Sequence, residues 1–156
     1  MSTMTEVRLQ RTIPAPPQRV YRAWLDPDLL RQWMTPGDLR VTRVEVDERV
    51  GGAYRIWQAG ADGDVCGCEC ELLELVPGER IVWRWGLFGP EGLDGAVFDT
   101  RLTVTLRGAP GGGTELTLVH ERLDALFEAL PHIAEEFEGG WATVLDKIGQ
   151  TLSNPV

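Results

Sequence analysis

The stretch from Ile133 to Leu152 constrains the fold most strongly. Apolar side chains recur there at helical spacing and fall on one side: Ile133, Phe137, Trp141, Val144, Leu145, Ile148 and Leu152. Polar side chains fall on the other: Glu136, Thr143, Asp146, Lys147 and Gln150. This pattern is typical of a long helix lying on a large apolar surface. Glycine costs about 1 kcal/mol inside a helix, so Gly139-Gly140 predicts a helix start or a kink.

The pattern of the residues before this helix predicts a sheet, which the helix would cover. Alternation of apolar and polar residues predicts seven strands: Glu6 to Ile13, Thr42 to Val46, Ala53 to Gln58, Val65 to Val76, Arg80 to Phe88, Ala96 to Arg107 and Thr114 to Leu123. Short, glycine-rich connections join the later strands, which favours antiparallel pairing. The alternation changes parity at Leu72-Leu73, which predicts a bulge there.

Two short helices are predicted after the first strand. Val20, Tyr21 and Trp24 recur at helical spacing, and Asp26-Pro27 suits the capping residue and first position of a second helix. A loop or short helix is expected at Asp124–Leu130. The sequence therefore predicts an α+β fold in one domain, residues 1–156 with a core of about 6–152. A curved antiparallel sheet of about seven strands would wrap the long C-terminal helix.

Charge and composition exclude several classes of function. The net charge of −9 argues against nucleic acid and against anionic membrane surfaces, because both attract basic proteins. No run of about 18 apolar residues predicts a membrane span, and no secretory signal is visible. The three cysteines lie within Cys66–Cys70 and form no disulfide framework. We therefore expect a cytoplasmic protein, with no metal or other cofactor.

A series of short motifs follows in order along the chain. They are Ile13-Pro14-Ala15-Pro16-Pro17, Val20-Tyr21-Arg22-Ala23-Trp24, Asp26-Pro27, Leu30 to Trp33, Val50-Gly51-Gly52, Cys66-Gly67 through Pro77, Val82-Trp83-Arg84-Trp85, Thr103-Val104-Thr105-Leu106, Gly113 to Leu118, His120-Glu121 and Gly140-Trp141. Together they span about Glu6 to Leu152, and they resemble AHSA-type members of the START/Bet v 1-like (SRPBCC) superfamily. The resemblance implies a helix-grip fold with a cavity between sheet and helix.

The same resemblance implies what such a chain does. Superfamily members bind hydrophobic small molecules in the cavity, and a few act on them, as aromatic polyketide cyclases do. Others assist the heat-shock-protein-90 ATPase, a stress-response role. That role belongs to relatives with a further N-terminal domain, which these 156 residues do not include, so a chaperone partner is the less favoured expectation.

Aromatic residues on the inner strand faces are the first candidates for the cavity wall. They are Tyr54, Trp83, Trp85, Phe98 and Trp141. The further candidates for ligand contact are Ile56, Cys68, Cys70, Thr100, Leu102, Leu118, His120, Phe137 and Leu145. Rings of this kind can stack on a flat ligand, and the alternative is a filled core. The long connection Gly86 to Ala96 would gate the mouth of the cavity.

Cysteine and histidine supply the candidates for chemistry. Cys66, Cys68 and Cys70 share one strand face, either as small buried hydrophobic residues or as a soft-metal or redox site completed by His120. His120 shares a face with Leu116 and Leu118. It could act as a general acid–base with Thr100 or Glu69 as partner, or simply be a satisfied buried histidine. His132 is expected to face solvent.

The leading hypothesis is binding of a hydrophobic, aromatic or lipid-like small molecule, with Thr100 and His120 orienting it. One alternative is a cyclase-like or hydrolytic enzyme that uses His120. Another is a protein-interaction module that docks a chaperone through its sheet face. Exposed edge strands would also allow a homodimer.

Overall fold

The computed structural model describes residues 6–34, 40–60, 65–88, 98–129 and 131–153. Its elements follow in this order: β1 (Val7–Ile13), α1 (Pro17–Leu25), α2 (Pro27–Trp33), β2 (Arg40–Val46), β3 (Ala53–Ala59), β4 (Val65–Val76), β5 (Arg80–Phe88), β6 (Phe98–Gly108), the 3-10 turn η2 (Pro110–Gly112), β7 (Thr114–Glu121), α3 (Asp124–Ala129) and α4 (Pro131–Ser153).

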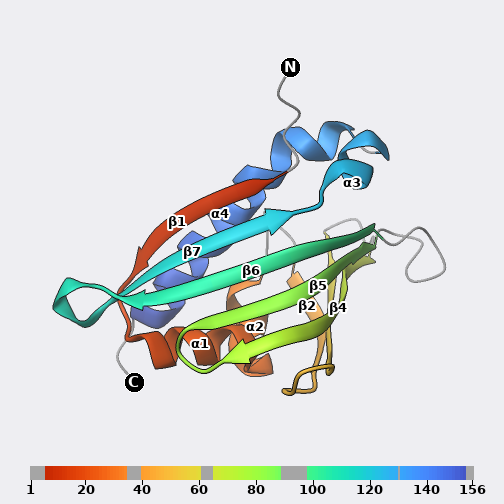
Figure 1. Ribbon diagram of the computed structural model, residues 1–156. Coiled ribbons are helices and arrows are strands. Elements are labelled where there is room, and N and C mark those ends of the chain that lie inside the picture. Colours follow the sequence, from red (N-terminus) through yellow and green to blue (C-terminus); the bar gives the residue numbers. More distant parts are fainter. Residues whose placement is uncertain (1–5, 35–39, 61–64, 89–97, 130, 154–156) are drawn as a thin grey trace.

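One antiparallel sheet contains all seven of these strands, in the order β1-β7-β6-β5-β4-β3-β2. Helix α4 runs obliquely along one face of the sheet, behind β1, β7 and β6 in Figure 1. Helices α1 and α2 lie at one end of the sheet and α3 at the other (Figure 1). This is the predicted helix-grip fold, and the fold class is confirmed.

Helix α4 is longer than one of the sequence interpretations allowed. It starts at Pro131 and continues through Gly139-Gly140, so a helix start at Gly140 is wrong. The apolar stripe is confirmed, because Trp141, Leu145 and Ile148 are buried. Packing of that stripe on the sheet offsets the cost of the two glycines, since tertiary contacts outweigh helix propensity.

The predicted bulge in β4 is present. The register between β4 and β5 shifts between Leu72 and Glu74. Leu72 is fully buried, while Leu73 is one of the exposed large apolar side chains. The bulge thus adds one residue and restores the inward alternation of β4. A second shift, between Val41 and Arg43 in β2, was not predicted.

A side-chain donor completes the end of α1. In a helix, the carbonyl of Ala23 would accept from the N–H of residue 27, but Pro27 has none. The indole Nε1–H of Trp33 donates to this carbonyl instead, over 2.9 Å. Asp26 caps the start of α2 by accepting from the Asp28 N–H at 2.9 Å.

Strand β3 supplies two more donors to the ends of the short helices. The Tyr54 hydroxyl donates to the carbonyl of Trp24 at 2.7 Å. The Gln58 amide donates to the carbonyl of Met34, the last residue of the α2 turn, also at 2.7 Å. These bonds fix α1 and α2 against the edge of the sheet that β2 and β3 form.

Buried apolar residues form a large and a small cluster. The large cluster fills the space between the sheet, α4 and the two short helices. The small cluster joins Val7 to Leu123 and Leu126, beside α3. Within the described part of the chain, no helix is both long and apolar enough to span a membrane.

Candidate functional site

A continuous row of aromatic rings crosses the inner face of the sheet. It begins on α1 with Trp24, whose ring centroid lies 5.5 Å from that of Trp83 on β5. Trp83 lies 5.5 Å from Tyr54 and 5.7 Å from Trp85. Trp85 in turn lies 5.7 Å from Trp141 on α4. The structure thus brings together four of the five aromatic residues predicted from sequence.

A polar relay fixes the α4 end of this row. The Trp141 indole N–H donates to Nδ1 of His120 at 3.0 Å. The Thr100 hydroxyl lies 2.5 Å from His120 Nε2 and donates to the carbonyl of Trp85 at 2.7 Å. Since Nδ1 accepts, a neutral His120 carries its proton on Nε2 and donates to Thr100. Each member of the relay is therefore satisfied.

Burial keeps His120 neutral. The side chain is fully buried, and this desolvation lowers the pKa of His120 from 6.5 to about 3. Both ring nitrogens already have partners, so proton transfer to a substrate would break one of these bonds. Of the two partners predicted from sequence, Thr100 contacts His120. Glu69 does not, because it lies on the other face of the sheet, 3.7 Å from Arg55.

The cysteines of β4 face the core. Cys68 and Cys70 are buried free thiols. Burial is the main reason that the pKa of the Cys70 thiol lies well above its ordinary value. The side chain of Cys66 is outside the described residues. In the described part of the chain, no three His, Cys, Asp or Glu side chains are placed to hold a metal ion. Cys68 and Cys70 fit the interpretation as small hydrophobic residues.

Two indole N–H groups in the row have no hydrogen-bond partner. They belong to Trp24 and Trp83, both fully buried. Each ring lies against other rings, and Trp83 meets Trp85 edge to face at 86°. Contact of an N–H with an aromatic face recovers only part of a normal hydrogen bond. The packing of this region is therefore dominated by apolar contact.

The Trp33 indole is hydrogen-bonded and the Trp83 indole is not, so their substitution should lower the stability by different amounts. Trp33→Phe removes a buried donor to the Ala23 carbonyl, whereas Trp83→Phe removes an unpartnered N–H. We expect Trp33→Phe to lower the free energy of unfolding by about 1–3 kcal/mol more than Trp83→Phe. Urea unfolding of the two variants measures the difference. Equal losses would show that the bond to Ala23 is not formed.

A seam of half-buried side chains separates the two apolar clusters. Leu9, Leu87 and Phe137 each pack against both clusters, yet none of the three is fully buried. The Phe137 ring lies 5.0 Å from His120 and 5.7 Å from Phe127 on α3. The inner face thus loses its complete burial near the start of α4, beside the relay.

The remaining predicted contact residues lie on the inner face of the sheet or, for Leu145, on α4. Their side chains are buried: Ile56, Cys68, Cys70, Leu102, Leu118 and Leu145. The side chain of Phe98 lies outside the described residues, as do those of His132 and most of the loop predicted to gate the cavity. Sequence reasoning did not select Trp24, Leu9 or Leu87. The helical pattern marked Trp24 as apolar, but no pattern indicated that it joins the aromatic row.

The family described as "Activator of Hsp90 ATPase homolog 1-like protein" matches residues 14–153. The chain belongs to this family. Protein CV1439 from Chromobacterium violaceum has a solved structure with 35% sequence identity and a TM-score of 0.82; the match covers 97% of this chain and 99% of that one. No curated protein matches significantly.

More distant structures show the same fold. The AHSA1 protein from Silicibacter pomeroyi is 21% identical, with a TM-score of 0.75 and coverage of 95% and 97% of the two chains. DynU16, a protein of the dynemicin biosynthetic locus, is 20% identical with a TM-score of 0.72. That match covers 97% of this chain but 48% of DynU16. Membership of this AHSA1-like family supports, in general terms, a fold that binds ligands.

Proposed function

We propose that the protein binds a flat, apolar small molecule between the inner face of its sheet and α4. The observation that carries this proposal is the seam at Leu9, Leu87 and Phe137, where the two clusters meet without full burial. Phe137 of the seam contacts His120, whose ring centroid lies 6.2 Å from that of Trp85 and 5.8 Å from that of Trp141. A ligand that entered there would meet aromatic faces on two elements, the arrangement that small-molecule sites favour.

The hydrogen bonds of the site support an apolar ligand. The hydroxyls of Tyr54 and Thr100 and both nitrogens of His120 are used within the protein. The indole N–H groups of Trp24 and Trp83 have no partner, but both lie among other rings. Recognition would therefore depend mainly on shape and apolar area. His120 and Thr100 would orient the ligand indirectly, because they hold Trp141 and Trp85 in place.

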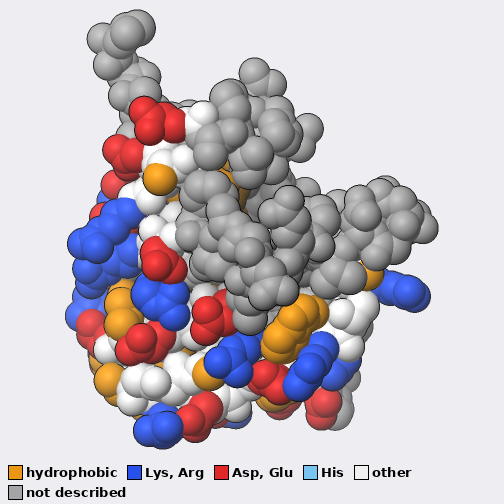
Figure 2. Space-filling model, turned by 90° about the vertical axis from the view of Figure 1, so that its right-hand side faces the viewer, with side chains coloured by type: hydrophobic (Ala, Val, Ile, Leu, Met, Phe, Trp, Pro, Cys, Tyr) orange, Lys and Arg blue, Asp and Glu red, His pale blue; other side chains and the backbone are white. Residues whose placement is uncertain are grey.

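The surface supports a small-molecule ligand more than a macromolecular partner. Figure 2 shows acidic and basic side chains interspersed over one face, with hydrophobic side chains scattered between them. The only large hydrophobic side chains exposed in the described chain are Val50 and Leu73. Docking surfaces for proteins usually present a larger contiguous apolar patch.

Binding of an apolar dye tests the proposal. We expect 1-anilinonaphthalene-8-sulfonate to fluoresce on the native protein, and Phe137→Ala to weaken its affinity by about tenfold, the loss of one well-placed aromatic contact. Leu73→Ala, on the exposed bulge of β4, is the matched control and should leave the affinity unchanged. The absence of saturable binding by the wild type, or equal weakening by both variants, would contradict the proposal. Separately, native mass spectrometry of the gently purified wild-type protein would identify any small molecule that it retains.

A further inference from the structure

Helix α3 lies against the seam at which the two apolar clusters meet. Leu126 of α3 and Leu123, just before the helix, pack with Val7 of β1 in the small cluster. The three seam side chains contact both this small cluster and the large one. Helix α3 also stands at the end of the sheet in Figure 1. A small molecule that approaches the seam from this end would therefore meet α3 first.

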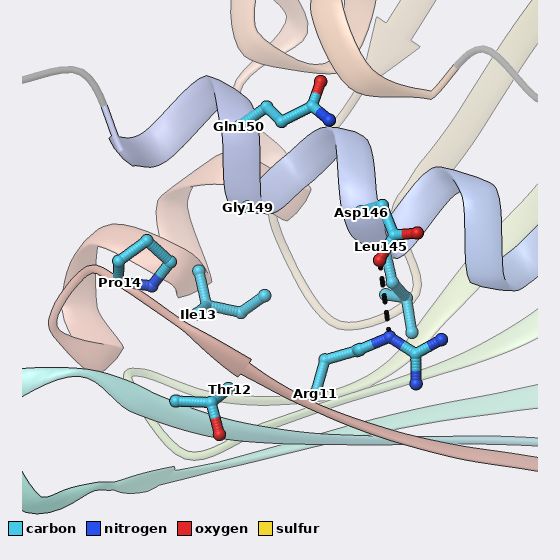
Figure 3. Close-up of a pocket in the computed structure, with 8 residues that line it drawn as sticks. All are labelled: Arg11, Thr12, Ile13, Pro14, Leu145, Asp146, Gly149 and Gln150. Atoms are coloured by element: carbon cyan, nitrogen blue, oxygen red, sulfur yellow. Dashed lines mark hydrogen bonds and ion pairs between the residues drawn. The ribbon is translucent and has the colours of Figure 1, made fainter.

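Packed side chains close the opposite end of α4. There the helix passes the end of β1, and Arg11 reaches towards Asp146, with its Nε 3.4 Å from a carboxylate oxygen (Figure 3). The shallow depression on this surface has Ile13 and Leu145 beneath it, and each is only 1% exposed. The gap between β1 and α4 is therefore filled at this end, which favours the seam as the entrance.

Few buried contacts hold α3 in place. Of its described side chains, only Leu126 is buried and Phe127 half-buried. The Phe127 ring lies 5.7 Å from that of Phe137 on α4. Segments with few buried apolar contacts open locally at a lower free energy than central strands do. We therefore expect α3 to open while the sheet and α4 stay folded.

The backbone is strained at Arg122, where the chain passes from β7 to α3. Its φ is 63°, and Arg122 is the one non-glycine residue with a positive φ in the described part of the chain. A Cβ atom makes this left-handed conformation unfavourable, by about fivefold or more in population. Strand β7 ends at Glu121 and α3 begins at Asp124, so the strain lies where α3 would turn. Opening of α3 would release it.

We propose that α3 is a lid, hinged at Arg122, that opens to admit an apolar ligand through the seam and then closes over it. This inference rests on the proposed function, because it requires a ligand site behind the seam. Strain at Arg122 favours the open position, whereas burial of Leu126 in the small cluster favours the closed one. The two opposing contributions keep the lid closed in the free protein but able to open.

Native-state hydrogen exchange tests the lid without a ligand. The Phe127 N–H donates to the carbonyl of Leu123 at 2.9 Å, so its exchange reports opening of α3. We expect this amide to exchange at least about a hundredfold faster than the amides of the central strand β6. Arg122→Gly removes the strain and should slow Phe127 exchange about fivefold relative to Arg122→Ala, which keeps a Cβ atom. Exchange of α3 only together with β6, or equal rates in the two variants, would overturn the proposal.

Stopped-flow binding of 1-anilinonaphthalene-8-sulfonate tests the role of the lid. Arg122→Gly should bind and release the dye about fivefold more slowly than Arg122→Ala, at equal affinity, because a lid slows passage in both directions. The two variants have lost the same positive charge, so attraction of the anionic dye is matched. Leu126→Ala removes a buried contact of the closed lid and should raise both rates at least about tenfold. A changed affinity at a constant association rate would make α3 part of the wall of the site and overturn the proposal.

The lid and the ligand site fail in different ways. If the wild type shows no saturable dye binding, the ligand site fails and the lid loses its role, even where hydrogen exchange shows that α3 opens. If the dye binds at the same rates in Arg122→Gly, Arg122→Ala and Leu126→Ala, the lid alone is overturned and the ligand site stands.

Discussion

Replacing Trp24 by alanine should lower the free energy of unfolding by about 3–5 kcal/mol, the usual cost of removing a buried tryptophan. Trp24 is fully buried, and its ring lies 4.5 Å from Trp33 on α2, 5.5 Å from Trp83 on β5 and 6.3 Å from Trp141 on α4. The substitution would thus open a cavity where α1, α2, the sheet and α4 meet. Total stabilities of natural domains are about 5–15 kcal/mol, so the variant should be close to unfolding.

Trp57→Ala provides the matched control for this prediction. Trp57 lies on β3 with its side chain half-buried, and the Arg43 guanidinium stands 4.8 Å from its ring centroid. Its removal should cost only about 1 kcal/mol, because the site is open to water and leaves no cavity. Urea unfolding at neutral pH measures both values. Similar losses in the two variants would show that Trp24 does not connect the elements around it.

The inner face of the sheet could be predicted because strand periodicity acts locally. Alternation in β5 placed Trp83 and Trp85 on one face, and both are buried. The change of parity at Leu72-Leu73 indicated the bulge that the register shift confirms. Each inference needed only neighbouring residues and the two-residue repeat of a strand.

The candidate site was less predictable because it joins residues that are distant in sequence. The seam brings Leu9, Leu87 and Phe137 together from β1, β5 and α4, and no local pattern marks such a meeting point. The interpretation of Gly139-Gly140 as a helix start was wrong for a related reason. Glycine propensity is a local quantity, whereas the packing that carries the helix through Gly139-Gly140 depends on the sheet beneath it.

One tertiary bond could have been anticipated from sequence. A proline four residues after Ala23 leaves that carbonyl without its helical donor, so another group must supply one if the site is buried. Trp33 does so. The identity of the donor could not be read from the chain, because it depends on how α2 folds back on α1.

Stability should fall as the pH drops below about 6.5, with His120 as a major cause. The pKa of a histidine in an unfolded chain is about 6.5, whereas burial lowers the pKa of folded His120 to about 3. Between these values the unfolded state binds more protons, so the free energy of unfolding increases with pH. The part of the stability that depends on a neutral His120 is fully present above pH 6.5 and is lost progressively down to about pH 3. At pH 4 the loss should be roughly 3 kcal/mol, at about 1.4 kcal/mol per pH unit.

A His120→Gln variant isolates this contribution. Glutamine does not titrate, and its amide can still accept from Trp141 and donate to Thr100, the two partners of the histidine. Carboxylates titrate in both proteins, so their effect cancels in the difference. Urea unfolding at pH 7 and pH 4 should show the wild type losing about 3 kcal/mol more than the variant. Parallel losses would mean that His120 is protonated without unfolding. The relay would then be open to solvent, and the enzyme hypothesis based on a titrating His120 would regain support.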